Sequence, residues 1–310
     1  MENQQLLPAS ELFWGSHHEI CRIEGFWYHA RHVESIAAFR SEFEPRNDDI
    51  LLTSFVKTGT TWLKALCCNI LDEQEKDILA TRNPHEVVPT IEIAFLQDRV
   101  QHMLLNSSLE RSRLLHAHLP YSHLPEKVRS SSSLGCKLVH VARNPKDTLV
   151  SMWHFYNKNE KLYTNGPFPL ERAVEIFCGG VVPWGPFYDN VLGYWEESRK
   201  RPEEVLFLKY EDLCRNPEEQ VRKLASFLGR ETSSMDVEKV LWRSSLNRLK
   251  ELEVNKNGAR KDAPDIPNSI LFRTGTVGDW KNYLTPDMAQ RIDSLTRVKL
   301  QGTGLSFDDE

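Results

Sequence analysis

Residues 50–71 have the sequence ILLTSFVKTGTTWLKALCCNIL, in which an apolar run, a polar turn and an amphipathic segment follow one another. The apolar run at 51–56 is typical of a buried parallel strand. The segment after the turn is predicted to be a helix, because its apolar residues have the i, i+3, i+4, i+7, i+8 spacing that places one stripe against a sheet. That stripe consists of Leu63, Leu66, Cys67, Ile70 and Leu71. A strand joined to a helix by one short turn predicts the first unit of an α/β fold.

Three further short runs rich in Leu and Val are predicted to be strands of the same sheet. They lie at residues 113–118, 137–142 and 205–209. Helical patterns separate them, and this alternation predicts a central, mainly parallel sheet flanked by helices. The 310 residues, 40% of them hydrophobic, are enough to fill a sizeable core. We therefore predict a single α/β domain over residues 1–310, in which residues 1–24 form an N-terminal extension.

Two predicted helices begin with the same signature, an asparagine that can cap the helix followed by a proline, which suits the first helical position. Asn144 and Pro145 begin the helix after the third strand, and Asp147 is predicted to return a hydrogen bond to the cap, as in a capping box. Asn216 and Pro217 begin the helix after the fourth strand. Each of these helices therefore follows a predicted strand along the chain, the second after the intervening residues 210–215.

Composition excludes several classes of function. The net charge of -5 and the pI near 6.2 argue against a general nucleic-acid binder, so any bound anion must be held by a local cluster. The six cysteines include no CxxC pair, which favours free thiols in a reducing compartment. The N-terminal sequence has no basic and apolar leader, and no window approaches 18 consecutive apolar residues. We expect a cytoplasmic protein with no membrane or nucleic-acid partner.

Polar and charged residues follow or end every predicted strand. In order, they are the turn at 57–61, His118, Arg143 and Tyr210. Because ligands of open α/β sheets bind beyond the carboxyl ends of the strands, these residues are expected to converge on one site.

The turn at 57–61 has the chemistry of an anion site. Backbone N–H groups at a helix N-terminus bind anions, Gly59 permits close approach, the threonines add donors and Lys57 adds positive charge. Its register differs from a Walker A loop, and taken alone it is equally compatible with a solvated polar turn. Arg143 and Ser151 suit a second phosphate, although an isolated arginine is also typical of a surface salt bridge. Together they predict two anion subsites.

Five ordered motifs resemble the cytosolic sulfotransferases. They are FVKTGTTW, HAHLPYSHLP, VARNPKDTLVSMWHFY, LFLKYEDL and RTGTVGDWKN. The segments EGFWY, GPFYDNVLGYW and LKELEVNKNG are similar to the plant branch, including flavonol sulfotransferases. The resemblance covers residues 25–282 and implies a P-loop-like fold. It also implies transfer of a sulfuryl group from 3′-phosphoadenosine 5′-phosphosulfate (PAPS) to a small-molecule hydroxyl acceptor, with PAP as product and no metal.

The resemblance implies roles for individual residues. The 5′-phosphosulfate is expected to be held by Lys57, Thr58, Gly59, Thr60 and Thr61, with Trp62 stacked on the adenine. The rest of the nucleotide is expected to contact Arg143, Ser151, Tyr210, Ser244, Leu246, Arg273, Thr274 and Gly275. The last three lie in the aperiodic segment 254–280, which we expect to cover the nucleotide and to order when it binds.

The resemblance also implies that His118 is the catalytic base and Lys57 the cation that stabilises the leaving group. Imidazole side chains titrate near neutral pH, and a positioned cation stabilises charge on a departing oxygen. Several residues depart from the family pattern: Val56 replaces a proline and Thr274 replaces a lysine, which predicts weaker nucleotide binding, and Ala117 stands where threonine is common. Gln290 replaces a glutamate of the dimerisation motif, so a monomer and a weak homodimer are both compatible with the sequence.

Aromatic residues from variable loops are candidates for the acceptor pocket. They are Trp27, Phe95, Trp153, Tyr163, Phe168 and Trp184, although each one singly is also typical of core packing. Together they favour a flavonoid, phenolic, steroid or jasmonate-like hydroxyl compound. Two alternative functions are a protein that binds PAP or PAPS without turnover and a P-loop kinase. The kinase is disfavoured because the strand ends supply no aspartate for Mg²⁺.

Overall fold

The structure of the protein is a computed structural model that describes residues 14, 19–97, 113–130, 136–158, 167–231, 235–259 and 266–307, together with the backbone of residues 5–6. Its central sheet has parallel strands in the order β5-β4-β6-β7. The strands are β4 (Ile50–Ser54), β5 (Leu114–Ala117), β6 (Lys137–Ala142) and β7 (Val205–Lys209). They coincide with the predicted runs and confirm the parallel sheet. β4 ends earlier than predicted, because the chain already turns at Val56 and Lys57.

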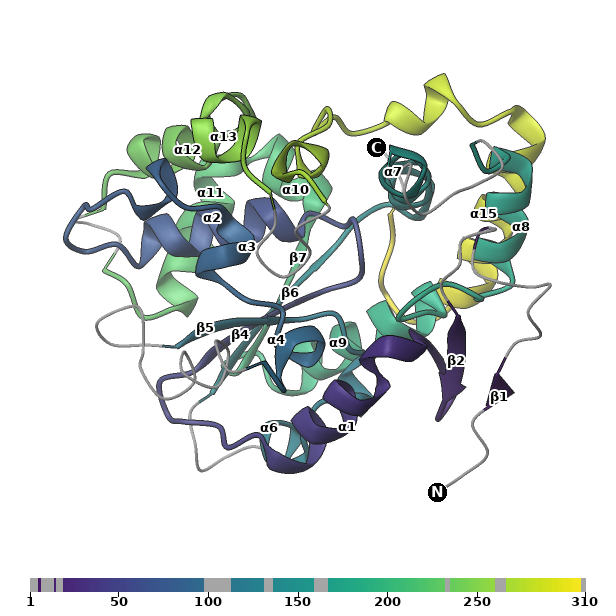
Figure 1. The fold of residues 1–310 in the computed structure, drawn as a ribbon, viewed down its shortest axis with the longest axis horizontal. Coiled ribbons are helices and arrows are strands. Elements are labelled where there is room, and N and C mark those ends of the chain that lie inside the picture. The colour runs from purple at the N-terminus through teal and green to yellow at the C-terminus, as the bar shows by residue number, and fades with distance from the viewer. Residues whose placement is uncertain are drawn as a thin grey trace.

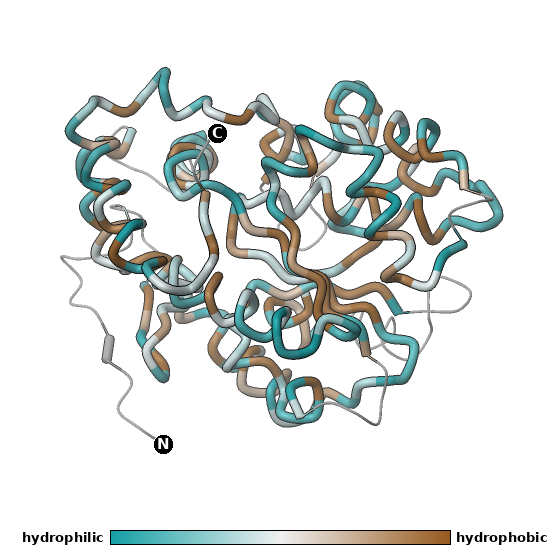
Figure 2. Tube along the Cα trace, turned by 180° about the vertical axis from the view of Figure 1, so that it is seen from behind, coloured by the Kyte–Doolittle hydropathy of each residue, from teal (hydrophilic) through white to brown (hydrophobic). Residues whose placement is uncertain are grey.

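Two apolar cores lie on the two faces of this sheet, because successive side chains of a strand point to opposite faces. In β4, Leu51 belongs to one core, whereas Ile50 and Leu52 belong to the other. Figure 2 shows the strands as a hydrophobic centre between helices of mixed hydropathy. The Leu52 face is covered by α2 (Thr60–Ile70), α11 (Pro217–Phe227) and α12 (Val237–Ser244). The Leu51 face is covered by α1 (Val33–Glu42) and α9 (Phe187–Lys200) (Figure 1).

A second group of elements lies beside the sheet (Figure 1). It contains α7 (Pro145–Lys158), α8 (Leu170–Cys178), α15 (Pro286–Leu300) and an antiparallel sheet of β1 (Gln5–Leu6), β2 (Ile20–Ile23) and β3 (Phe26–His29). The remaining helices are short: α3 (Pro84–Val87), α4 (Ile91–Ala94), α6 (Glu126–Arg129), α10 (Tyr210–Arg215), α13 (Leu246–Glu251) and α14 (Glu253–Lys256). Helix α15 packs against α9 on the sheet, and residues of both groups share one apolar core, so the two groups form one body.

The start of α7 departs from its predicted capping box. Asn144 does cap the helix, since its Oδ1 accepts from the N–H of Lys146 at 2.9 Å. Asp147 does not return a bond to the cap. Its carboxylate accepts instead from the N–H groups of Gly278 and Trp280, at 2.7 and 3.0 Å. The capping-box prediction is therefore wrong, because a partner distant in sequence competes for this carboxylate. Asp147 fixes the C-terminal segment to α7.

We expect Asp147→Ala to loosen the segment around Gly278. Loss of two hydrogen bonds to a buried carboxylate should raise the rate of limited proteolysis there about tenfold, while the sheet stays intact. Asp189→Ala is the matched control, because Asp189 is a partly exposed residue of α9 that pairs with Lys299 of α15 at 3.2 Å. Equal cleavage rates in both variants would contradict this anchoring role.

Candidate active site

A cavity of about 870 Å³ opens beyond the carboxyl ends of β4, β5 and β6. The predicted site residues that line it come from distant parts of the chain. They are Lys57, Gly59, Thr60, Thr61, Trp62, His118, Arg143, Ser151, Trp184, Tyr210, Ser244, Leu246, Arg273 and Gly275. The structure therefore brings most of the predicted residues together in one cavity, large enough for a nucleotide and a second molecule.

Other predicted residues lie away from the cavity lining. Trp27 and Phe95 are buried in the core, and Phe168 stacks on Trp14 with ring centroids 5.5 Å apart. The indole of Trp153 donates to the carbonyl of Phe168 at 2.7 Å. These aromatic residues serve packing in this structure. Thr274 is exposed beside the cavity, and Tyr163 lies outside the described residues.

The polar turn has a strained, tightly held backbone. Lys57 and Gly59 both have left-handed φ angles, of 67° and 116°, and Gly59 caps α2. The fully buried hydroxyl of Thr58 is directed inward, to the carbonyls of Phe55 and Val141 at 2.8 and 2.9 Å. Thr58 therefore ties the turn to β6 and does not face the cavity. The turn places the first N–H groups of α2 at the cavity wall.

We expect Gly59→Ala to distort this turn. An added Cβ would lie 2.8 Å from Cδ2 of the Tyr210 ring, and the left-handed φ adds strain. The free energy of unfolding should fall by about 1–3 kcal/mol, and affinity for PAP should fall with it. Gly229→Ala is a matched control, since Gly229 has a φ of 79° but space for a Cβ, with the nearest atom at 3.7 Å. That control should lose some stability and keep full PAP affinity, so an equal loss of affinity in both variants would contradict the role of the turn.

Two guanidinium groups also line the cavity. Arg143 donates to the carbonyl of Thr276 at 2.8 Å and packs 4.5 Å from the centre of the Tyr210 ring. Arg273 forms an ion pair with Asp279. The Nε donors of both arginines have no hydrogen-bond partner among the described residues, although both atoms are buried. Both arginines line the cavity, and guanidinium groups held in place by such contacts fit an anion.

Between the turn and the arginines the lining is largely apolar and aromatic. The rings of Trp62 and Tyr210 meet edge to face with centroids 5.5 Å apart, and the Tyr210 hydroxyl donates to the carbonyl of Gly275 at 2.8 Å. A Cβ on Gly275 would lie 2.8 Å from Cδ2 of Leu246. The Ser244 hydroxyl accepts from Asn69 at 2.9 Å. This section suits a planar heterocycle with polar edges.

His118 is held from several sides. Its Nδ1 lies 2.8 Å from the carbonyl of Ser54, which can only accept, so Nδ1 carries the proton and Nε2 keeps its lone pair. The backbone N–H of His118 donates to Glu92 at 2.5 Å, and burial raises the pKa of Glu92 to about 7. The ring lies 5.0 Å from that of Trp184. This arrangement presents a fixed basic nitrogen, as a general base requires.

The cavity lining also contains residues to which the sequence assigned no role. They are His29, Arg31, His32, Ile93, Gln97, Phe155 and Tyr156. The His29 and His32 rings lie 5.8 and 6.4 Å from the ring of Trp184, and the ammonium of Lys57 lies 4.3 Å from the centre of the Phe155 ring. His29, Arg31 and His32 come from the β3–α1 junction, and Ile93 and Gln97 come from α4 and the residues after it, where no motif marks a site. Phe155 and Tyr156 end the motif VARNPKDTLVSMWHFY, but the resemblance assigned them no role.

The charges of the lining are of one sign. Arg31, Lys57, Arg143 and Arg273 line the cavity, whereas none of the described lining residues is Asp or Glu. A cavity of this kind attracts anions even in a chain whose net charge is -5. Within the described ranges, no group of three or more His, Cys, Asp or Glu side chains is arranged to hold a metal ion. In the same ranges, no helix has the length and apolar character needed to cross a membrane.

The chain is similar to known proteins over most of its length. Residues 47–304 match the family described as the sulfotransferase domain. Cytosolic sulfotransferase 5 of Arabidopsis thaliana is 39% identical over 97% of this chain and 94% of its own. Cytosolic sulfotransferase 17 of the same plant is 42% identical over 90% and 82%. The crystal structure of mouse sulfotransferase SULT7A1 complexed with PAP has a TM-score of 0.69 at 28% identity, covering 91% of this chain and 94% of its own.

Proposed function

The chain belongs to the sulfotransferase family and is a PAPS-dependent enzyme, and we propose that it sulfates a hydroxyl of a small hydrophobic acceptor with His118 as base. The observation that carries this proposal is the convergence of two anion subsites and one basic nitrogen in a single cavity. The turn before α2 supplies the first subsite, and the guanidinium groups of Arg143 and Arg273, which line the same cavity, supply the second.

The nucleotide fits the cavity in one orientation. The 5′-phosphosulfate lies at the turn, where Lys57, Thr60 and Thr61 and the first N–H groups of α2 can donate to it. The 3′-phosphate lies between Arg143 and Arg273, and the adenine lies against Trp62. In the reverse orientation the sulfuryl group would be at the arginine end of the cavity, whereas His118 follows β5, directly beside β4 and the turn.

The proposed reaction is an in-line displacement at sulfur. The acceptor oxygen forms a bond to sulfur while the bond from sulfur to the bridging phosphate oxygen breaks. Nε2 of His118 takes the hydroxyl proton, and the Ser54 carbonyl stabilises the imidazolium through Nδ1. The electron pair of the broken bond stays on PAP, where the Lys57 ammonium and the turn stabilise the new charge. The products are the sulfate ester and PAP.

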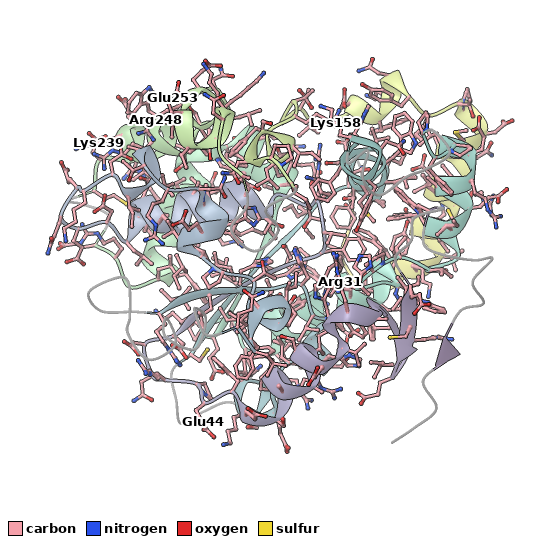
Figure 3. All side chains as sticks on the ribbon, in the orientation of Figure 1. Arg31, Glu44, Lys158, Lys239, Arg248 and Glu253 are labelled. Atoms are coloured by element: carbon pink, nitrogen blue, oxygen red, sulfur yellow. The ribbon has the colours of Figure 1, made fainter. Side chains whose placement is uncertain are left out.

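The acceptor lies beyond His118, between Phe155, Tyr156 and Trp184, which give this end flat apolar walls. These walls fit a flavonoid, phenolic, steroid or jasmonate-like compound. Arg31, with its Nε 3.2 Å from Nε2 of His32, lies near the start of α1 (Figure 3) and favours acceptors that also carry an acidic group. The relatives are named cytosolic, and we propose the same compartment, with the enzyme acting as a monomer or weak homodimer.

A labelled-transfer assay tests this function. Purified protein is incubated with radiolabelled PAPS and a panel of phenols, flavonols, steroids and hydroxylated carboxylic acids, with and without EDTA. We expect label in a product, undiminished by EDTA. PAP binding without any labelled product would favour the non-catalytic alternative, whereas transfer that requires ATP and stops with EDTA would favour a kinase.

A further inference from the structure

A group of hydrogen-bonded polar side chains lies directly behind the turn, and we call it the polar network. It consists of Ser54, Thr60, Thr61, Lys64, His85, Thr90 and His116. At its centre is Lys64, which is fully buried in α2 and does not line the cavity. Lys64 follows Thr60 by four residues and Thr61 by three, a spacing that places it on the helix face below both threonines.

The Lys64 ammonium has three donors and no acceptor. Three acceptors lie within hydrogen-bond distance of it: the carbonyl of Val88 at 2.8 Å, Oγ1 of Thr90 at 3.2 Å and Nδ1 of His85 at 3.2 Å. Each of these atoms must therefore accept. A chain of hydrogen bonds runs from two of them back to the turn.

The first chain passes through His85. Since Nδ1 of His85 accepts from Lys64, its neutral ring carries the proton on Nε2. That Nε2 lies 2.9 Å from Oγ1 of Thr61 and donates to it. The hydroxyl hydrogen of Thr61 then points away from His85 and can be donated to an anion at the turn.

The second chain passes through Thr90 and His116. In the direction proposed below, Thr90 accepts from Lys64 and donates to Nδ1 of His116, 3.0 Å away, and Nε2 of His116 donates to Ser54, 2.9 Å away. Burial lowers the pKa of His116 well below its ordinary value, so the ring is neutral and carries one proton. The Ser54 hydroxyl then donates to Oγ1 of Thr60 at 2.7 Å. The hydroxyl hydrogen of Thr60 is left for the anion as well.

We propose that Lys64 is a positioning residue that sets the direction of both hydrogen-bond chains, so that Thr60 and Thr61 present their hydroxyl hydrogens to the anion at the turn. The proposal rests on the proposed function, in which that anion is the phosphosulfate. If the chains ran the other way, both threonines would donate inward and turn lone pairs toward the anion. Burial of an ammonium group costs free energy of folding. Methionine would fill the same space without this cost, so packing alone does not account for a lysine at this position.

The first test uses the folded wild-type protein without nucleotide. With ¹⁵N-labelled imidazole rings, NMR distinguishes the two neutral tautomers, and loss of a signal in His85→Gln or His116→Gln assigns each ring. We expect His85 and His116 to carry the proton on Nε2, and His118 on Nδ1. A proton on Nδ1 of His85 would overturn the proposal, because that nitrogen could not accept from Lys64. This result does not depend on PAP binding, so it is separate from a failure of the proposed function.

The second test is a double-mutant cycle on PAP affinity, measured by calorimetry. We expect Lys64→Met to weaken PAP binding about ten- to a hundredfold in the wild-type background, because two hydrogen bonds to a charged group are misdirected. In a Thr60→Val/Thr61→Val background the same change should cost less than about twofold, since the hydroxyls are already absent. Cys68→Ala, a buried truncation in the same helix, should lower stability without such coupling. Equal losses from Lys64→Met in both backgrounds would overturn the proposal.

Discussion

Replacing His118 with asparagine is expected to lower kcat by about a hundred- to ten-thousandfold, the usual contribution of a general base, while PAP affinity stays within about twofold. The reason is the geometry of the ring. Ser54 holds the proton on Nδ1, and Nε2 is left as the basic atom. Asparagine can still donate to Ser54 but has no basic nitrogen. Steady-state transfer of labelled sulfate gives kcat, and calorimetry with PAP gives the affinity.

His123→Asn is the matched control for this experiment. His123 lies in the same HAHLPYSHLP segment, but it is buried away from the cavity, near the Tyr28 hydroxyl and 3.2 Å from the carboxylate of Glu24. Its loss should lower thermal stability and leave kcat of the folded enzyme unchanged. If His118→Asn kept full turnover, or if both histidine variants lost it equally, His118 would not be the base.

Replacing Arg143 with methionine is expected to weaken PAP binding about a hundredfold. Arg143 is held by the carbonyl of Thr276 and by Asp147, and its Nε is buried without a partner among the described residues. Charge-assisted hydrogen bonds from a fixed guanidinium contribute about 1.5–3 kcal/mol each. Lysine at this position should restore only part of the affinity, since it keeps the charge and loses the planar arrangement of donors.

If Arg143 binds the 3′-phosphate, its replacement should affect the affinities for PAP and for 5′-AMP differently. Affinity for 5′-AMP, which lacks that phosphate, should change little in Arg143→Met, so the loss should be specific to PAP. Arg215→Met serves as the control, because Arg215 is a mostly exposed arginine of α10 that pairs with Asp212 at 3.7 Å. Equal losses for PAP and 5′-AMP in Arg143→Met would place the arginine elsewhere in the site.

The sheet and the turn could be predicted from the sequence because their signals are local. Continuous apolar runs mark buried strands, and the change to helical spacing at Leu63 marks the crossover helix. Strand ends in a parallel sheet meet at one edge, so residues as distant as Lys57 and Tyr210 could be placed in one site without a contact map. Their arrival in one cavity follows from that topology.

The other features of the site depend on contacts between residues distant in sequence, which local sequence patterns do not encode. Asp147 has the spacing of a capping box, yet two N–H groups more than a hundred residues later take its carboxylate. Thr58 has the same side chain as Thr60, and only the position of β6 directs its hydroxyl inward. The proposed acceptor pocket combines residues of the β3–α1 junction with Phe155, Tyr156 and Trp184, and Lys64 has the sequence pattern of an ordinary polar residue of α2. Each of these roles is set by a partner from another element.

We propose that one adenine nucleotide binds at two separate anion subsites without a metal. Calorimetry on the wild-type protein in EDTA, comparing PAP with 5′-AMP and adenosine 3′-phosphate, tests it most directly. We predict that PAP binds at least about tenfold more tightly than either mononucleotide, because each phosphate gains charge-assisted hydrogen bonds of its own. Equal affinity for PAP and one of the mononucleotides, or binding that appears only when a divalent cation is added, would contradict the claim.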